Sequence, residues 1–280
     1  MAVAGESGKG GALAANARMY APNAQAADAW RALFDWVSAR SGVPLVVLDH
    51  GFPARLEDLW SRDDLGAAFM CGWPFVRAGS RHRIVAAPVP AAARYGGRAE
   101  YRTDFVVRAE SAIHRLEDSF GGRLAFTVDH SHSGYNAPRH HLLRFRKADR
   151  PTLYAATVGP CVTPKRVLDA VLDGSADVAP LDGYTLELML RHDPELGPRI
   201  RIVASTDPVP MPPLVASPSV PDGVVEALRA AFLASGEAPA LAAVREALVL
   251  AGFAVTDPAD YALTERWAAE ALAAGYPAPA

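Results

Sequence analysis

The stretch RLAFTVDHSHSGYNAPRHH, residues 123–141, changes from one pattern to another near its middle. Its first part, RLAFTVD, has the apolar and β-branched residues typical of a buried strand. Ser133, Gly134 and Tyr135 then begin a predicted helix, whose first amide groups lack partners within the helix and carry the positive end of its dipole. Such a helix start binds anions without needing a charged side chain. The stretch therefore predicts part of an α/β protein with an anion site at the turn.

Side chains at this turn would add to such a site. Ser131 and Ser133 carry hydroxyl donors, and Gly134 would let a ligand oxygen approach the backbone closely. Alternatively, Ser131 or Ser133 only caps the helix. A hydrolase would use Asp129, Ser131 and His132, but neighbours in sequence rarely converge in space and the Gly-x-Ser-x-Gly elbow is absent from the sequence.

A metal site is a further alternative for the same stretch. It would combine His130 and His132 with His140 or His141, but a helix from Ser133 would aim His140 away from the strand residues. The cysteines, Cys71 and Cys161, lie far apart without CxxC spacing, so we predict neither a zinc cage nor a disulfide framework. We expect no metal and no cofactor.

The composition narrows the range of partners. With 280 residues, half of them hydrophobic, the chain can form one large domain or two lobes with a substantial core. The net charge of -3 gives no sign of a nucleic-acid or polybasic membrane surface. A small molecule is therefore the expected partner, and nucleic acid is not.

The N-terminus resembles neither a signal sequence nor a P-loop. It lacks an uninterrupted apolar segment, and in GESGKGG (residues 5–11) Lys9 is followed by glycine rather than Ser or Thr. We expect a flexible tail over residues 1–16. The chain as written is expected to be cytoplasmic, or periplasmic if a leader was removed or the start misassigned.

Apolar runs alternate with helical patterns along the chain, which predicts α/β architecture with mainly parallel sheets. Strands are expected at residues 17–22, 43–49, 64–70, 83–89, 101–108, 123–129, 152–158, 176–182 and 199–206. Helices are expected from Trp30 to about Ser41, over 110–118, from Ser133 and over 164–174. A proline-rich crossing segment, 207–221, precedes a C-terminal part expected to be helical throughout, beginning with an apolar stripe of Val224, Val225, Leu228, Ala231 and Phe232.

The order of several motifs resembles the phosphate/phosphonate-type solute-binding proteins of ABC transporters. These motifs are RMYAP (18–22), MCGWPF (70–75), YRTDFVV (101–107), LAFTVDHSHSGYNAPR (124–139), the run 157–194 containing ADVAPLD, and IRIVASTDPVPMPPLVAS (200–217). The resemblance covers about residues 17–250 and implies a type 2 periplasmic-binding-protein fold with two lobes, a two-segment hinge and an interlobe cleft. Lobe one would be 17–104 plus 209–280, lobe two 105–208, with crossings at 101–104 and 205–210.

The resemblance also implies a set of ligand-binding residues. The serine-rich turn would grip a phosphonate or phosphate, aromatic residues would wall the cleft, and an acidic residue would meet the amino group of an aminophosphonate. The set is Ser131, His132, Ser133, Gly134, Tyr135, Tyr20, Trp73, Tyr101, Thr103 and Asp182. Alternatively, Trp73 belongs to the core and Asp182 caps a following helix.

One segment departs from the family pattern. Relatives often carry Gly-Ser-His-x-x-Ser where this chain has GPCVTP, residues 159–164, so two oxyanion donors are missing. Thr157 or Thr163 would have to compensate, or the ligand is not a phosphonate. Cys161 reads as a structural thiol rather than a nucleophile, since no base can be assigned to it.

The favoured function is a solute-binding protein that captures a small anionic or zwitterionic ligand for an ABC transporter or a sensor, and we expect a monomer. The alternative is a cytoplasmic enzyme on the same fold, acting on a small carboxylate or phosphorylated metabolite. That enzyme would need a general acid or base in the cleft, with His132 and Asp182 as first candidates. A role as an interaction domain is a third alternative, which an apolar cleft without hydrogen-bond donors would indicate.

Overall fold

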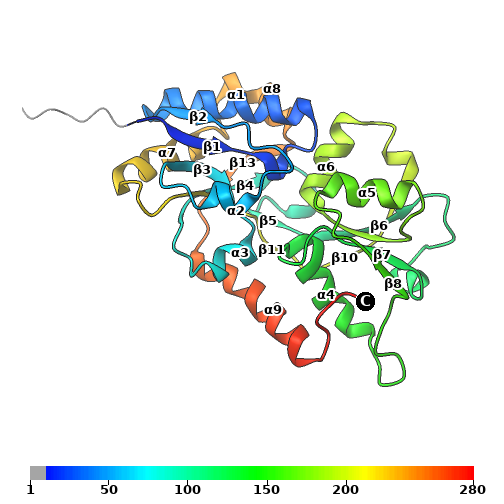
Figure 1. The fold of residues 1–280 in the computed structure, drawn as a ribbon. Coiled ribbons are helices and arrows are strands. Elements are labelled where there is room, and N and C mark those ends of the chain that lie inside the picture. Colours follow the sequence, from blue (N-terminus) through cyan, green and yellow to red (C-terminus); the bar gives the residue numbers. More distant parts are fainter. Residues whose placement is uncertain (1–10) are drawn as a thin grey trace, which may run out of the picture.

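The computed structural model describes residues 11–280 and shows two α/β lobes side by side (Figure 1). The first lobe contains a six-stranded sheet in the order β13-β4-β12-β3-β1-β2. Its strands are β1 (Leu13–Asn16), β2 (Leu45–Val47), β3 (Leu65–Phe69), β4 (Arg83–Pro90), β12 (Leu214–Ala216) and β13 (Leu250–Ala254). Its helices are α1 (Ala24–Ser41), α2 (Leu56–Trp60), α3 (Gly72–Arg77), α7 (Asp222–Ala234) and α8 (Ala242–Ala247).

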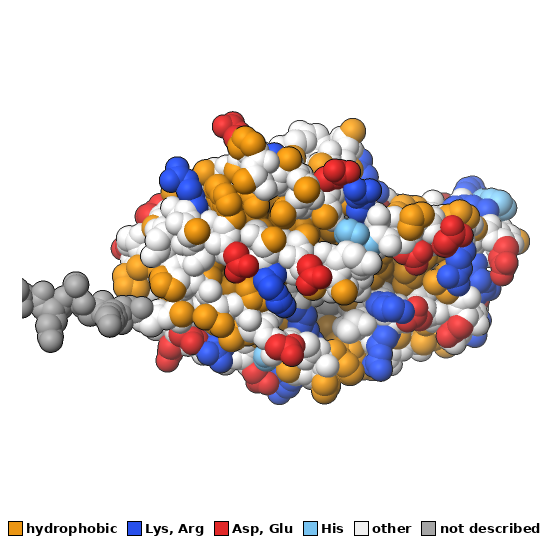
Figure 2. All heavy atoms as spheres, turned by 90° about the horizontal axis from the view of Figure 1, so that it is seen from above, with side chains coloured by type: hydrophobic (Ala, Val, Ile, Leu, Met, Phe, Trp, Pro, Cys, Tyr) orange, Lys and Arg blue, Asp and Glu red, His pale blue; other side chains and the backbone are white. Residues whose placement is uncertain are grey.

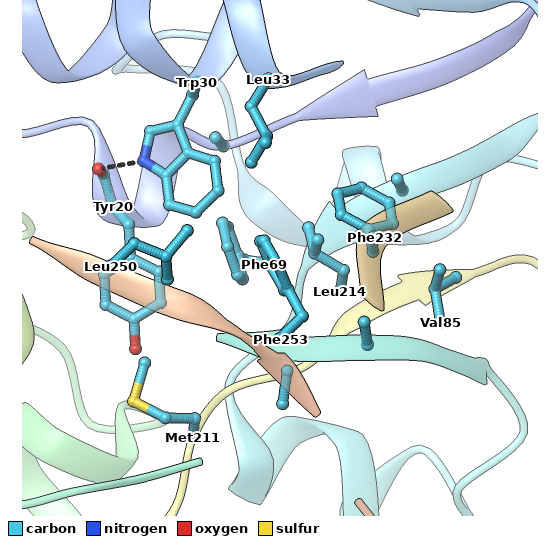
Figure 3. Packing of buried hydrophobic residues seen from close by; sticks show 14 of the residues in the cluster. Tyr20, Trp30, Leu33, Phe69, Val85, Met211, Leu214, Phe232, Leu250 and Phe253 are labelled. Atoms are coloured by element: carbon cyan, nitrogen blue, oxygen red, sulfur yellow. Dashed lines mark hydrogen bonds between the residues drawn. The ribbon is translucent and has the colours of Figure 1, made fainter. Parts of the chain in front are cut away.

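The predicted first helix is confirmed as α1, and local signals explain both of its ends. The Asn23 side chain accepts a hydrogen bond from the Ala26 amide at the start, and Gly42 takes the left-handed conformation that ends the helix. Its apolar face packs into the main core, where Trp30 lies between Tyr20, Phe69 and Phe253 (Figure 3). This packing fixes Tyr20 at the edge of the lobe.

The second lobe is built on a three-stranded sheet in the order β10-β6-β9, extended by the β7–β8 pair through a bridge between Leu124 and Val178. Its strands are β6 (Thr103–Arg108), β7 (Arg123–Ala125), β8 (Ala156–Val158), β9 (Ala179–Asp182) and β10 (Ile200–Ser205). Its helices are α4 (Ala137–Leu142), α5 (Pro164–Leu172) and α6 (Gly183–His192), with a π-helical turn (His132–Asn136) directly before α4.

Two antiparallel segments connect the lobes. β5 (Glu100–Tyr101) pairs with β11 (Val209–Pro210), and Thr103 and Thr206 exchange two hydrogen bonds of 3.0 and 2.9 Å beside them. These segments overlap in part with the two expected crossings, 101–104 and 205–210, and the lobe boundaries stay predictions. Seen from above, the joined lobes form one elongated body whose surface mixes both signs of charge (Figure 2).

The expectation of mainly parallel sheets was wrong. Among the strand ladders of residues 11–280, only β1–β2, β1–β3 and β7–β8 are parallel, whereas the other pairings are antiparallel. The strands that follow the second crossing, β12 and β13, enter the first sheet in the opposite direction to their neighbours β3 and β4. The sheets are therefore mixed, which the local sequence patterns could not show because they do not encode strand direction.

Three local predictions also need correction. The first strand is β1, not residues 17–22, where Arg18–Tyr20 forms a short 3-10 turn, so residues 13–16 are sheet rather than tail. The predicted helix 110–118 reduces to a turn at Leu116–Ser119, because the Asp118 carboxylate captures the amides of His114 and Arg115. The C-terminal part is not helical throughout, because the strand β13 interrupts it. Residues 1–10, which carry most of the expected tail and of GESGKGG, lie outside the described residues.

The last helix, α9 (Ala262–Ala273), packs against both lobes. It contacts α3 of the first lobe and α4 of the second, and the following segment lies against lobe two, where Leu153 N donates to Ala280 O at 3.1 Å. Part of the segment predicted as lobe one thus also binds lobe two (Figure 1). In residues 11–280 no single helix is long and apolar enough to cross a bilayer; one bent pair, 222–234 with 239–247, passes by length and composition alone.

Candidate ligand-binding site

A cavity of about 380 Å³ lies between the lobes, with walls from both. The second lobe contributes the segments that follow β7, β8 and β9, which is where α/β sheets place ligand contacts. Its polar lining residues are Thr127, His130, Ser131, Ser133, Thr163, Lys165, Asp182 and Thr185. The first lobe contributes Arg18, Tyr20, Cys71 and a mostly apolar set, Met19, Ala21, Pro22, Phe52, Leu56, Trp60, Pro74 and Pro212.

The predicted turn forms one wall of this cavity. Ser131 caps the π-helical turn, since its Oγ accepts a hydrogen bond from the Gly134 amide at 3.0 Å. Thr103 Oγ1 donates to the Ser133 carbonyl at 3.1 Å and fixes the turn against β6. Ser131 is therefore a helix cap, as the alternative reading had it, and also a cavity residue. Ser133 lines the cavity beside Ser131.

The turn needs glycine at position 134 for a different reason from the one predicted. A Cβ atom at this position would lie 2.0 Å from Thr127 Oγ1, so the glycine is required by Thr127 rather than by a ligand oxygen. Thr127 Oγ1 is buried without a hydrogen-bond partner in residues 11–280, and Thr127 lines the cavity. Sequence reasoning missed Thr127, although it lies within the predicted strand 123–129 that leads into the turn.

Asp182 both caps a helix and lines the cavity. Its Oδ1 accepts from the Thr185 amide at 3.0 Å at the start of α6, and its Oδ2 accepts from the Tyr20 hydroxyl at 3.2 Å. The second bond joins the two lobes across the cavity. Burial raises the pKa of the Asp182 carboxyl to about 7, and it raises the pKa of Tyr20 well above its usual range.

Arg18 supplies a cation that sequence reasoning missed. Its Nη1 donates to the carbonyls of His50 and Ala54, so the guanidinium holds the loop 50–54 against the cavity. The signal was present in the RMYAP motif, where an arginine lies two positions before Tyr20, the aromatic residue that was identified. Lys165, by contrast, pairs with Asp169 at 2.8 Å on the surface of α5.

Cys71 lies in the cavity wall, and Cys161 does not. The His132 amide donates to Cys71 Sγ at 3.3 Å, and burial raises the pKa of this thiol to about 11, so it stays neutral. Cys161 Sγ lies 3.5 Å from the Val158 carbonyl. Neither thiol has the lowered pKa of a nucleophile.

Five predicted binding residues lie away from the cavity. His132 stacks on Trp267 with ring centroids 5.7 Å apart, and its burial lowers its pKa to about 3, which leaves it neutral. Trp73 Nε1 donates to Glu265 at 2.8 Å, and the Tyr135 hydroxyl donates to the Pro277 carbonyl at 3.1 Å. Tyr101 and Thr103 are buried beside the hinge, behind the turn. The positions of these residues in the sequence did not predict which way each side chain faces.

The histidines of the turn separate in space. His130 pairs with Glu57 of the first lobe at 3.3 Å, His140 pairs with Glu270 at 2.6 Å, and His141 packs on Phe105. Within residues 11–280 no three His, Cys, Asp or Glu side chains are grouped to hold a metal ion. The metal and triad arrangements considered from sequence therefore do not form there.

The divergent segment 159–164 offers few donors to the cavity. The Cys161 and Val162 amides donate to the carbonyls of Phe126 and Thr127 at 3.0 and 2.9 Å. Val162 lines the cavity with a φ of 70°, and Thr163 accepts from the Arg166 amide as the cap of α5. Thr163 thus lies at the cavity as one of the two possible replacements, while Thr157 is exposed on β8 outside the lining.

A family model described as the phosphonate periplasmic substrate-binding protein of ABC transporters matches residues 19–261. The chain belongs to this family. The family consists of transporter binding proteins rather than enzymes, so the enzyme alternative is set aside. It is also a periplasmic family, which gives the cytoplasmic expectation no support. A search of curated proteins found no match.

Solved structures agree with the family at the level of fold. A binding protein of an ABC phosphonate transporter from Pseudomonas aeruginosa has a TM-score of 0.78 at 16% identity, covering 94% of this chain and 87% of its own. PhnD1 from Prochlorococcus marinus in complex with methylphosphonate has a TM-score of 0.73 at 16% identity, covering 92% and 97%. A Xanthomonas citri protein bound to ATP has a TM-score of 0.62 at 23% identity, covering 94% and 98%. The chain thus has the two-lobed type 2 fold of these binding proteins.

Proposed function

We propose that this family member binds a small ligand with a terminal tetrahedral oxyanion, a phosphonate or phosphate monoester, in the cavity between its lobes. It would present this ligand in the periplasm to the membrane subunits of an ABC transporter. The observation that carries the proposal is that Thr127, Ser131 and Ser133, three residues with hydroxyl groups, line that cavity together at the start of the π-helical turn. Hydroxyl donors beside a helix N-terminus are what an oxyanion requires.

The charges around the cavity support an anionic ligand. Arg18 places a guanidinium at the opposite wall. Because the pKa of Asp182 is raised to about 7, the carboxyl is largely neutral below that pH and repels an anion little. The same carboxyl would accept a hydrogen bond from the amino group of a zwitterionic ligand, so aminomethylphosphonate belongs in the test.

Contacts between the lobes support capture by closure. Besides the Tyr20–Asp182 hydrogen bond, Glu57 of lobe one lies 3.3 Å from His130 of lobe two. A ligand held by both lobes would strengthen the closed arrangement, which is how hinge-closing proteins retain their ligands. We expect one ligand per chain and a monomer in solution.

Calorimetric titration of the purified protein with methylphosphonate, aminomethylphosphonate and phosphate tests the proposal. We expect saturable binding, and we expect Ser133→Ala to weaken it roughly tenfold or more, since a hydrogen bond to a charged group contributes about 1.5–3 kcal/mol. Ser175→Ala, an exposed serine on the surface of lobe two, serves as the matched control and should bind normally. Equal affinity of the Ser133 variant and the wild type would remove the turn from the site.

A further inference from the structure

The cavity exceeds the space that a methylphosphonate or phosphate ion fills. Its volume of about 380 Å³ falls in the range of about 300–1,000 Å³ found for drug-sized ligands. A water molecule in the liquid occupies about 30 Å³, so a compact oxyanion would leave most of this space to solvent. A larger ligand would fill it and exclude that water.

Most of the hydroxyl groups in the lining lie on the lobe-two side of the cavity. The serine and threonine hydroxyls come from lobe two. Apart from Arg18 and Tyr20, whose hydroxyl already donates to Asp182, lobe one faces them mainly with Met19, Phe52, Leu56, Trp60 and Pro74. The only N–H of the Trp60 side chain donates to the Phe69 carbonyl at 2.9 Å, so the indole presents an apolar surface to the cavity. We propose that the bound oxyanion carries an apolar organic group, of about the size of a phenyl ring, packed against this wall.

The divergent loop of lobe two favours the same kind of ligand. The Cys161 and Val162 amides are already bonded to backbone carbonyls, and Val162 adds a branched apolar side chain to the lining. Leu181 and Met189 extend the apolar surface from β9 and α6. The loop 159–164 therefore adds apolar surface to the cavity and few donors, which suits a ligand with an organic group beside its anionic one.

Phe52 of the apolar wall also contacts lobe two. Phe52 belongs to the loop held by Arg18 and is 48% exposed, and the Arg166 guanidinium of α5 lies 4.8 Å from its ring centroid. This cation–π contact joins lobe one to lobe two at the cavity edge. With the lobes in contact there, Phe52 covers the place where the organic group would lie.

This inference rests on the proposed function, because it assumes that an oxyanion occupies the turn. It adds the class of the ligand, an aryl or alkyl group bearing a terminal phosphonate or phosphate ester. Titrations with methylphosphonate, phenylphosphonate and phenyl phosphate separate the two claims. We expect both aryl compounds to bind about tenfold or more tightly than methylphosphonate, since a single methylene in an apolar pocket contributes about 10–200-fold in discrimination and a phenyl ring is larger. The two aryl compounds compared with each other distinguish a phosphonate from a phosphate ester.

Leu56→Ala tests the apolar wall directly, with Leu233→Ala, an exposed leucine of α7, as its matched control. Leu56→Ala should weaken phenylphosphonate binding severalfold while changing methylphosphonate affinity less than about twofold; Phe52→Ala should behave alike. Thermal unfolding of each variant confirms that it is folded. If none of the compounds binds, the proposed function fails. If methylphosphonate binds as tightly as phenylphosphonate, or if Leu56→Ala weakens both equally, the function stands and the apolar subsite is overturned.

Discussion

Asp182 shows how one residue can serve the fold and the site together. One carboxylate oxygen caps the start of α6, and the other joins the lobes by accepting a hydrogen bond from Tyr20. The position of Asp182 at the end of a strand was predictable from sequence, as were its two alternative roles, helix capping and ligand binding. Its burial and its contact with Tyr20 were not, because they depend on how two distant segments meet.

The raised pKa of Asp182 predicts how stability depends on pH. The folded protein holds the proton up to about pH 7, whereas the unfolded chain releases it near 3.8, so this group favours folding below 3.8 and loses that effect as the pH rises toward 7. We expect the contribution to disappear in Asp182→Asn. Comparing urea unfolding at several pH values, with the exposed Asp28→Asn as control, measures the difference. An unchanged pH dependence in the Asp182 variant would contradict the assigned pKa.

Gly134 predicts a steric effect within the turn. Gly134→Ala would place a methyl group 2.0 Å from Thr127 Oγ1, so the turn or Thr127 must move. We expect a loss of about 1–3 kcal/mol in unfolding free energy, the usual range for overpacking, together with weaker phosphonate binding. Gly223→Ala is the control, because nothing lies within 4 Å of its added Cβ in α7. The account is contradicted if both alanine variants are equally stable.

At the scale of elements, strongly periodic or strongly apolar segments were predictable. The apolar stripe of α1 and the capped helix α5 match the structure, as do β3 and β4. β1 was missed because its sequence LAAN has small side chains that give little pattern, although Ala14 and Ala15 are fully buried in the sheet. β13 was missed because an alanine-rich segment reads as helix until a sheet edge pairs with it.

Helix α9 is the element whose role depends most on tertiary packing. Trp267 stacks on His140 at 4.6 Å and on His132 at 5.7 Å, directly behind the ligand-binding turn. Asn136 Nδ2 donates to the Thr264 carbonyl at 2.8 Å, which ties the same turn to the helix backbone. The helix thus supports the turn from the side opposite the cavity.

Trp267→Ala should therefore destabilise the protein by about 3–5 kcal/mol, as expected for truncating a buried tryptophan. Leu272→Ala, on the same helix but 58% exposed, should change the unfolding free energy by less than about 0.5 kcal/mol. Chemical denaturation of the two variants checks this contrast. Similar stability of both would mean that α9 does not support the turn.

At the scale of the whole molecule, the two lobes contribute different groups to one cavity. Lobe two brings the hydroxyls and helix starts, lobe one brings Arg18 and the apolar wall, and Tyr20 meets Asp182 between them. The sequence predicted the two lobes and the serine-rich turn, because motif order and local patterns extend along the chain. It did not predict Thr127, Arg18 or Leu56 as lining residues, because cavity walls are formed by segments distant in sequence.

A crystal structure of the protein with phenylphosphonate tests the central claim most directly. The account predicts phosphonate oxygens within hydrogen-bonding distance of Ser133 and Thr127 on lobe two, with the phenyl ring against Leu56 and Phe52 on lobe one. A ligand bound outside the interlobe cavity, or one whose phosphonate makes no contact with the turn 127–134, would contradict it.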